Sequence, residues 1–149
     1  FIKKAWTVEA LFDTVSRYEA HFNHIHLSAC WNALGHQARA AGPDWPAAHA
    51  GALELLLRRT LRTVSACGEI QARQLANIAH GVGKAGLGRD VVGELTTALS
   101  TSLQPRLGDC NAQELANISW AFAKARHADA ALFRGLARAA EQRLGDFNA

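Results

Sequence analysis

One helical pattern occurs twice in this chain, 40 residues apart, and this repeat constrains the fold more than any other feature. The segment QARQLANIAHGVGKAG at 71–86 is matched by NAQELANISWAFAKAR at 111–126. Both segments contain Leu-Ala-Asn-Ile followed by a lysine, so that Asn77 corresponds to Asn117. A repeat of this length predicts a stack of similar supersecondary units, each of which buries its apolar face against its neighbours.

Each copy has the apolar spacing of a helical hairpin. In the first helix of each unit, apolar residues recur at i, i+3 and i+7, which is the spacing of one helix face. These residues are Leu75, Ile78 and Val82 in one unit and Leu115, Ile118 and Phe122 in the next. A second apolar stripe follows a short polar turn in both cases, so that each unit reads as helix, turn, helix.

The whole chain has the composition and periodicity of helices. Ala fills 30 of its 149 positions, and Ala favours the helix more than any other residue. Seven helices are predicted, at 7–22, 28–41, 47–65, 71–86, 89–104, 111–126 and 129–144. Thr7 and Ser28 are the expected N-caps of the first two, and Gly42-Pro43 is the expected end of the second. The predicted fold class is therefore all-α, a solenoid of helical hairpins with repeats of about 38 residues.

The end of the chain repeats the start of the second unit. RLGDFNA at 143–149 echoes RLGDCNA at 106–112. We expect a single α-solenoid segment over 1–149, with degenerate N-terminal helices at 1–66, repeats at 67–108 and 109–145, and the start of a further repeat at 146–149. Because the chain begins with Phe1 instead of Met, we expect a mature or partial product of a longer chain.

Composition limits the classes of partner. The net charge is +3, carried by 12 Arg and 4 Lys against 13 acidic residues, and this mild excess permits a polyanionic partner without requiring one. No apolar run approaches the ~20 residues that span a bilayer, so no membrane partner is expected. The three cysteines are widely spaced and odd in number, which favours a reducing compartment over a disulfide framework.

Each repeated first helix carries an Asn, a flat ring and a cation in one row, opposite its apolar face on a helical wheel. The rows are Asn77, His80 and Lys84, then Asn117, Trp120 and Lys124, with a looser version in Asn32, His36 and Arg39. An Asn offers a donor and an acceptor to a base edge, a ring stacks on a base, and a cation binds a phosphate. These nine residues are therefore predicted to bind RNA.

Structural roles explain the same residue types, and the sequence leaves both interpretations open. Trp120 suits packing between units, and His80 suits an interhelical contact. The two asparagines suit a hydrogen-bonded ladder between neighbouring first helices. Lys84 and Lys124 lie near the ends of their helices, where a cation also stabilises the helix dipole.

A second cationic patch lies in LLLRRTLRTV, where Arg58, Arg59 and Arg62 are predicted to add phosphate contacts. Motifs for catalysis are absent, since neither GxxxxGK[ST] nor GxSxG occurs. The cluster His21, His24, His26 and Cys30 straddles a helix end without the spacing of a zinc motif. We therefore expect no enzyme activity, no metal, no cofactor and no small-molecule substrate.

The segment NAQELANISWAFAKARHADAALFRGLARAAEQRLGDFNA resembles the octotricopeptide repeat, a degenerate helical hairpin whose first helix typically reads like eLAnllWAlAkl. The likeness covers 109–149 well and 69–108 fairly. The earlier FNHIHLSACWNAL is similar to the segment that precedes the repeats in these proteins and in their RAP-domain relatives. His80-Gly81 departs from the Trp-Ala that the family prefers, so that unit is expected to be structurally loose.

The resemblance implies an organellar RNA-binding protein, in the mitochondrial matrix or the chloroplast stroma. It implies partners among mRNA or rRNA, and among ribosomal or other ribonucleoprotein proteins. The predicted function is non-catalytic binding and stabilisation of single-stranded or ribosomal RNA. The alternative is a structural component of a mitochondrial ribosome or another large RNA–protein assembly, acting mainly as a protein scaffold.

Overall fold

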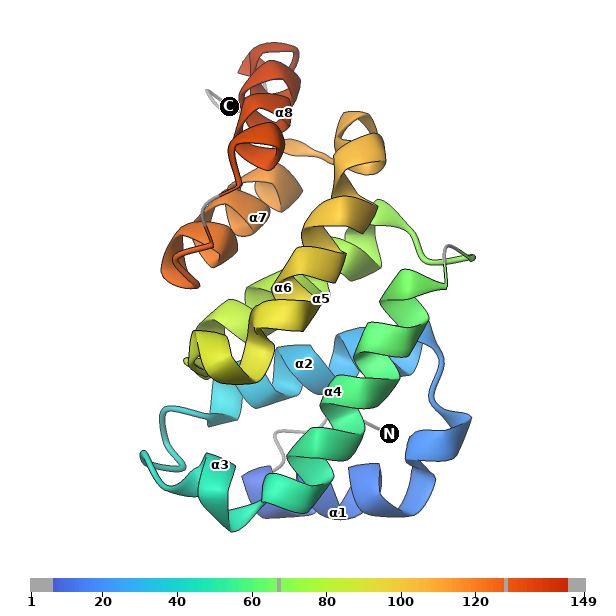
Figure 1. Ribbon diagram of the computed structural model, residues 1–149, viewed down its shortest axis with the longest axis vertical. Helices are drawn as coiled ribbons and strands as arrows, with labels where there is room; N and C mark the ends of the chain where they lie inside the picture. Colours follow the sequence, from blue (N-terminus) through green and yellow to red (C-terminus); the bar gives the residue numbers. More distant parts are fainter. Residues whose placement is uncertain (1–6, 67, 128, 145–149) are drawn as a thin grey trace.

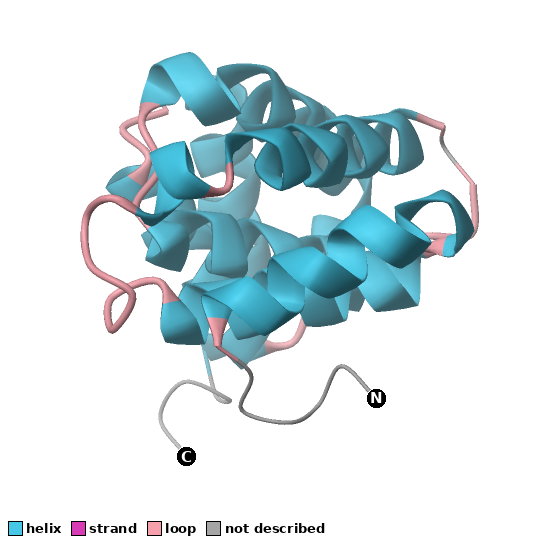
Figure 2. Cartoon of the chain, turned by 90° about the horizontal axis from the view of Figure 1, so that it is seen from below, coloured by secondary structure: helices cyan, strands magenta, loops and turns pink. Residues whose placement is uncertain are grey.

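The computed structural model describes residues 7–66, 68–127 and 129–144, and these residues form helices joined by short loops, with no strand among them (Figures 1 and 2). The α-helices are α1 (Val8–Tyr18), α2 (His24–Gln37), α3 (Trp45–Ala48), α4 (Ala50–Ser65), α5 (Ala72–Ala85), α6 (Arg89–Leu103), α7 (Ala112–Lys124) and α8 (Ala130–Glu141). Two 3-10 helices, η1 (Glu19–His21) and η2 (Gln104–Asp109), extend α1 and α6. No helix in the described part of the chain is long and apolar enough to cross a bilayer. The predicted all-α class is confirmed.

The predicted boundaries hold in the second half of the chain because strong end signals are present there. Gly86 has φ +71° and ends α5 in the left-handed region that favours glycine. Asn111 begins α7 with a capping box, in which its side chain accepts from the N–H of Glu114 and the Glu114 carboxylate accepts from the N–H of Asn111. Thr7 caps α1 as expected, with its hydroxyl 3.2 Å from the amide of Ala10.

Three boundaries in the first half were predicted wrongly. Helix α2 ends at Gln37, before the Gly42-Pro43 that was expected to end it. Asn23, not Ser28, is the N-cap of α2, since its side chain accepts from the N–H groups of Ile25 and His26. Ser28 is instead buried inside the helix. The single helix predicted at 47–65 is broken at His49, where α3 ends and α4 begins.

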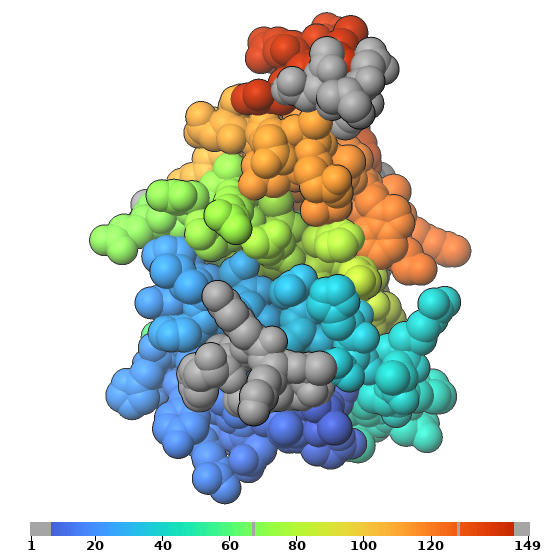
Figure 3. Space-filling view, turned by 180° about the vertical axis from the view of Figure 1, so that it is seen from behind, coloured from blue at the N-terminus to red at the C-terminus, as the bar shows by residue number. Residues whose placement is uncertain are grey.

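The first helices of the hairpins pack in one row, with α5 between α2 and α7. In the space-filling view these three helices follow one another along the long axis of the molecule, from blue-cyan through yellow-green to orange (Figure 3). The second helices α4 and α6 pack against each other in front of that row, while α8 packs on α7 and η2 (Figure 1). Helix α1 packs on α2 and α4.

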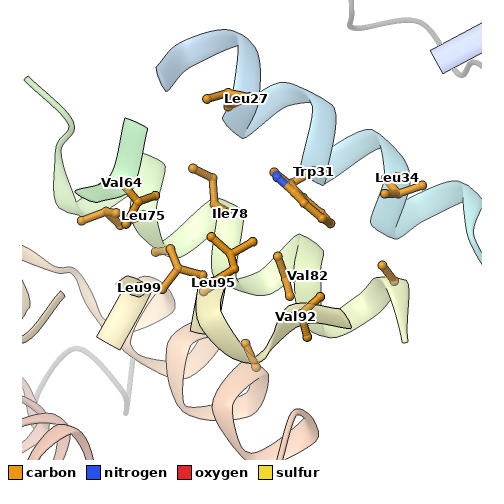
Figure 4. Packing of buried hydrophobic residues seen from close by; sticks show 14 of the residues in the cluster. Leu27, Trp31, Leu34, Val64, Leu75, Ile78, Val82, Val92, Leu95 and Leu99 are labelled. Carbon is orange, nitrogen blue, oxygen red and sulfur yellow. The ribbon is translucent and has the colours of Figure 1, made fainter. Parts of the chain in front are cut away.

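The core lies between the two rows. Leu27, Trp31 and Leu34 of α2 approach Ile78 and Val82 of α5, with Val92, Leu95 and Leu99 of α6 beyond them (Figure 4). Trp31 is fully buried, and its indole N–H donates to the hydroxyl of Thr60 at 2.9 Å. That bond satisfies the polar atom of the ring and ties α2 to α4.

The row of first helices depends on glycines at the points of closest approach. A Cβ at Gly81 would overlap the backbone carbonyl of Trp31 on α2 and lie 2.9 Å from its Cβ. On the other side of α5, a Cβ at Gly83 would lie 3.2 Å from the Cα of Ala121 on α7. Gly81 and Gly83 therefore let the backbone of α5 touch both neighbours. The expectation that His80-Gly81 loosens this unit is wrong, because α5 runs unbroken to Ala85 and both glycines are buried.

We expect Gly81→Ala to destabilise the protein by about 1–3 kcal/mol, because the added methyl forces α2 and α5 apart. Gly93→Ala is the matched control, since Gly93 also lies inside a helix but has nothing within 4 Å of an added Cβ. There the alanine should stabilise by roughly 0.5–1 kcal/mol through helix propensity. Urea unfolding of the two variants measures both changes. Equal effects would mean that the close approach at Gly81 does not contribute to stability.

The loop between α7 and α8 is fixed to α6 by a polar cluster. The Asp129 carboxylate accepts a hydrogen bond from the Ser100 hydroxyl on α6. It also accepts from the N–H of Leu132 at 3.0 Å and is thereby the N-cap of α8. His127 lies 3.9 Å from the same carboxylate and 3.3 Å from the hydroxyl of Thr96. The hydrogen bond from Ser100 is the main reason why the pKa of Asp129 is lowered from 3.8. The folded state therefore favours the ionised carboxylate.

Because the folded pKa of Asp129 is below its unfolded value, its contribution to stability is present above pH 3.8 and is lost as the pH falls through the folded pKa. We expect Asp129→Asn to lower the free energy of unfolding at pH 7, and this difference from wild type should shrink below pH 3.8. Thermal unfolding from neutral to acid pH measures it. Asp13→Asn, at an exposed position of α1, should leave the profile nearly unchanged. A deficit in Asp129→Asn that does not vary with pH would contradict the assignment.

Candidate nucleic-acid interface

The predicted rows lie on the side of α5 and α7 that faces away from the core. Along α5, Lys84 is exposed, and Asn77 and His80 are half-buried. Along α7, Trp120 and Lys124 are exposed, and Asn117 is half-buried. We call these six residues, together with Asn32 and His36 on α2, the outer stripe. Both Asn32 and His36 are exposed.

Trp120 both packs between helices and remains open to solvent. Its ring meets that of His80 edge to face, with 5.2 Å between the centroids and 63° between the planes. It also lies over Gly83, where an added Cβ would be 3.2 Å from Cζ3 of the indole. Even so, 43% of the residue is exposed. The two interpretations of Trp120 are therefore compatible, since contact with α5 fixes the ring and leaves part of it free for a ligand.

The contacts on the two sides of α5 give the structural register of the three helices. Gly35 of α2 faces Gly81 of α5, just as Gly83 of α5 faces Ala121 of α7. Since Gly81 and Ala121 are equivalent positions of the repeat, Gly35 corresponds to Gly83, an offset of 48 positions (83 − 35).

In this register the row on α2 aligns with the rows on α5 and α7 about one helical turn away from the alignment that the sequence predicted. Asn32 corresponds to His80, and His36 corresponds to Lys84. The Nδ1 atom of His36 lies 3.5 Å from Nζ of Lys84, which places the two side chains next to each other. Arg39 lies in the turn after α2, one turn beyond the stripe. The sequence could not show this, because α2 lacks the Leu-Ala-Asn-Ile that aligns the other two helices.

The asparagines do not form a ladder between helices within the described part of the chain. The side-chain oxygen of Asn117 instead accepts from the amide of Gln113, one turn earlier on the same helix, at 2.9 Å. This bond holds the side chain of Asn117 and leaves its amino group as a donor. Gln113 and the exposed Arg73 occupy equivalent positions, and both extend the outer stripe by one turn. On a helical wheel extended toward the helix N-termini, both positions fall on the side of the outer stripe.

The electrostatics of the stripe favour an anion. The stripe contains two lysines, and Arg73 adds a third cation one turn away along α5. The one acidic residue of α2, α5 and α7 is Glu114, and its carboxylate takes part in the capping box of α7. Burial lowers the pKa of His80, with smaller contributions from Lys84 and His36. His80 is therefore a neutral ring at pH 7, suited to stacking and hydrogen bonding more than to charge.

The three arginines of α4 lie in different environments. Arg59 is half-buried, and its guanidinium donates twice to the carbonyl of Phe22, at 3.1 and 2.8 Å. It thereby holds the turn that leads into α2. Arg58 pairs with Glu54 one turn earlier at 2.8 Å, and Arg62 is exposed. All three lie on α4, in the second row of helices, and so apart from the outer stripe.

The cysteine and histidine cluster noted in the sequence is not a convergent site. No group of three or more His, Cys, Asp or Glu in the described residues is placed to hold a metal. Cys30 is buried, which raises its pKa to about 12, and His26 accepts from the N–H of Asn23 at the start of α2. Burial likewise raises the pKa of Cys110 to about 11. Cys67 lies outside the described residues.

Comparison of the chain with protein families, characterised proteins and solved structures found no match. The resemblance to the octotricopeptide repeat therefore stays a prediction. The functional inference rests on the surface chemistry of the outer stripe.

We expect Arg59→Ala to destabilise the protein by about 1–3 kcal/mol, because it leaves the carbonyl of Phe22 without its charged donors. Arg58→Ala is the matched control, since it removes a neighbouring arginine from an exposed ion pair and should cost under about 1 kcal/mol. Urea unfolding distinguishes them. If both variants unfold at the same urea concentration, Arg59 has no special structural role.

Proposed function

We propose that the chain is a helical-hairpin repeat protein that binds single-stranded RNA along the outer stripe, without catalysis. The proposal rests mainly on the surroundings of Trp120. Its ring contacts that of His80, 43% of the residue is exposed, and Lys124 follows one helical turn later. Aromatic rings next to cations are the usual elements of single-strand recognition, since bases stack on the ring and phosphates meet the charge.

The arrangement of the three helices supports reading of successive nucleotides. Neighbouring first helices touch at their glycines, so that equivalent side chains of adjacent helices lie side by side. His36 contacts Lys84, and His80 contacts Trp120, across the two helix boundaries. Helical-repeat proteins that read RNA use two or three side chains per repeat for each base. Asn117, with a free amino group oriented by Gln113, suits a base edge in such a scheme.

The resemblance to the octotricopeptide repeat extends the proposal to the cellular compartment of the protein. An organellar protein that binds mRNA or rRNA, in a mitochondrion or a chloroplast, fits the mild basic charge and the absence of catalytic motifs. Of the predicted contacts, we keep the outer stripe and assign Arg39, Arg58 and Arg62 to peripheral phosphate contacts. Arg59 is left out because its guanidinium is bound to the carbonyl of Phe22.

Binding of the chain to a fluorescent single-stranded RNA, measured at several salt concentrations, tests the proposal. We expect Trp120→Ala to weaken binding by about 1–3 kcal/mol, the usual value of one stacked base. The double variant Lys84→Ala and Lys124→Ala should weaken binding and lower the salt slope by roughly 0.7 for each phosphate that the variant no longer neutralises.

Two controls separate binding from folding. Trp120→Phe should retain most of the affinity, because a flat ring remains. Arg138→Ala removes an exposed cation from α8, outside the outer stripe, and should leave the affinity and the salt slope unchanged. If Trp120→Ala binds RNA as wild type does, or if Arg138→Ala weakens binding as much as the lysine variants do, the outer stripe is not the RNA-binding surface.

A further inference from the structure

Equivalent residues of the outer stripe form lines that cross the three helices. The last turns of α2, α5 and α7 carry the first of these, which we call the C-terminal line, and its residues are His36, Lys84 and Lys124. Nδ1 of His36 lies 3.5 Å from Nζ of Lys84. Because an ammonium group can only donate, Nδ1 is the acceptor, and the neutral ring then carries its hydrogen on Nε2. The line therefore presents hydrogen-bond donors from one helix to the next.

A second line lies one helical turn closer to the helix N-termini. We call it the middle line, and it consists of Asn32, His80 and Trp120. The side chains on α5 and α7 are rings, and they meet with 5.2 Å between their centroids. Burial is the main reason why the pKa of His80 is lowered. The middle line is therefore flat and uncharged at pH 7, in contrast to the C-terminal line.

The next level of the stripe differs between the helices. Asn77 and Asn117 lie about one turn beyond the middle line on α5 and α7, but the equivalent position of α2 is the half-buried Ala29 (77 − 48). The oxygen of Asn117 is bound to Gln113, so its amino group is left as a donor. Helices α5 and α7 therefore present an amide at this level, and α2 presents a methyl group.

These groups repeat in the same two directions as the groups of a nucleic acid strand. A strand repeats its phosphates along its length, and each nucleotide changes from phosphate to ribose to base across that length. Across the helices, each line of the stripe repeats one kind of group. Along α5 and along α7, the side chains change from cation to ring to amide over seven residues (84 − 77 and 124 − 117), which is about 10.5 Å of helix. A strand that crosses the helices therefore meets like groups at each step.

Arg73 does not begin a second cationic line at the opposite end of the stripe. Its equivalents are Gln113 on α7 and Ile25 on α2 (73 − 48), and both are uncharged. Phosphates are therefore favoured at the C-terminal line. Because helix C-termini carry a partial negative charge, phosphate binding there depends on the donors of the side chains.

We propose that single-stranded RNA crosses α2, α5 and α7 with its phosphates on the C-terminal line and its bases directed toward the helix N-termini. The nucleotides at α5 and α7 stack on the rings of the middle line, and Asn77 and Asn117 read their base edges. The nucleotide at α2 is held by its phosphate alone, since Ala29 offers no hydrogen bond. This orientation rests on the proposed RNA binding and adds to it the direction of the strand and one position that is not read.

A gain of affinity at His36 tests the orientation. The probes are a fluorescent single-stranded RNA of mixed sequence and an abasic strand of the same length, which keeps the phosphates without the bases. At about pH 7.5 an imidazole is ordinarily uncharged, so His36→Lys adds a cation to the C-terminal line. We expect His36→Lys to bind both strands about three- to tenfold more tightly in ~0.1 M salt, and to raise the salt slope by roughly 0.7.

Ala131→Lys is the matched control, because it adds the same charge at an exposed position of α8, outside the outer stripe. It should change neither the affinity nor the salt slope. A gain of affinity cannot result from a loss of fold, so His36→Lys keeps the test valid where an alanine variant fails to fold. Circular dichroism shows which variants are folded.

Two asparagines distinguish the positions that are read from the one that is not. The probes are single-stranded oligomers of adenine, cytosine or uracil nucleotides. Asn117→Ala should reduce the differences in affinity among them by about two- to tenfold, the value of one hydrogen bond. Its affinity for the abasic strand and its salt slope should match those of wild type. Asn32→Ala removes the same side chain from α2 and should leave the base preference unchanged.

The outcomes separate this orientation from the proposed function. A wild-type chain that binds no RNA overturns both. When Trp120→Ala weakens RNA binding, the orientation alone is overturned if His36→Lys leaves the salt slope unchanged. It is also overturned if the wild-type chain binds the three oligomers equally, or if Asn32→Ala and Asn117→Ala change the base preference to the same extent.

Discussion

The close packing of α2, α5 and α7 is the constraint on which the rest of this structure depends. Gly81 and Gly83 remove the side chains that would hold α5 away from its two neighbours. Because the backbones touch, the side chains that point outward from adjacent helices are brought within contact distance. The pairs His36–Lys84 and His80–Trp120 are direct results of this approach. The core packing and the candidate binding surface therefore have one common cause.

This common cause explains why structural and functional interpretations of the outer stripe are hard to separate. Trp120 contacts His80 across the boundary between α5 and α7, and 43% of the residue remains exposed to solvent. A side chain fixed in this way loses little conformational freedom when a ligand binds. Arg59 shows the opposite case. It was predicted as a phosphate contact, but it is half-buried and two nitrogens of its guanidinium donate to the backbone carbonyl of Phe22.

The sequence predicted those parts of the fold that local signals determine. The helices from α5 onward follow from the repeated apolar spacing and from strong end signals such as Gly86 and Asn111. In the first half Thr7 caps α1 as expected, but Ser28 competed with Asn23 as a plausible cap of α2. The outer stripe of α5 and α7 could be predicted from the wheel. Contacts between distant residues could not, because the bond from Arg59 to Phe22 and the register of α2 depend on tertiary packing.

The two glycines of α5 also affect how the chain folds. Glycine inside a helix costs about 1 kcal/mol relative to alanine, so α5 with Gly81 and Gly83 has weak intrinsic helicity. Its stability must come from being held on both sides, by α2 and by α7. In many repeat arrays each unit adds its own stability to a sum over neighbours. Since α5 packs on both α2 and α7, a change that loosens either neighbour is expected to weaken α5 as well.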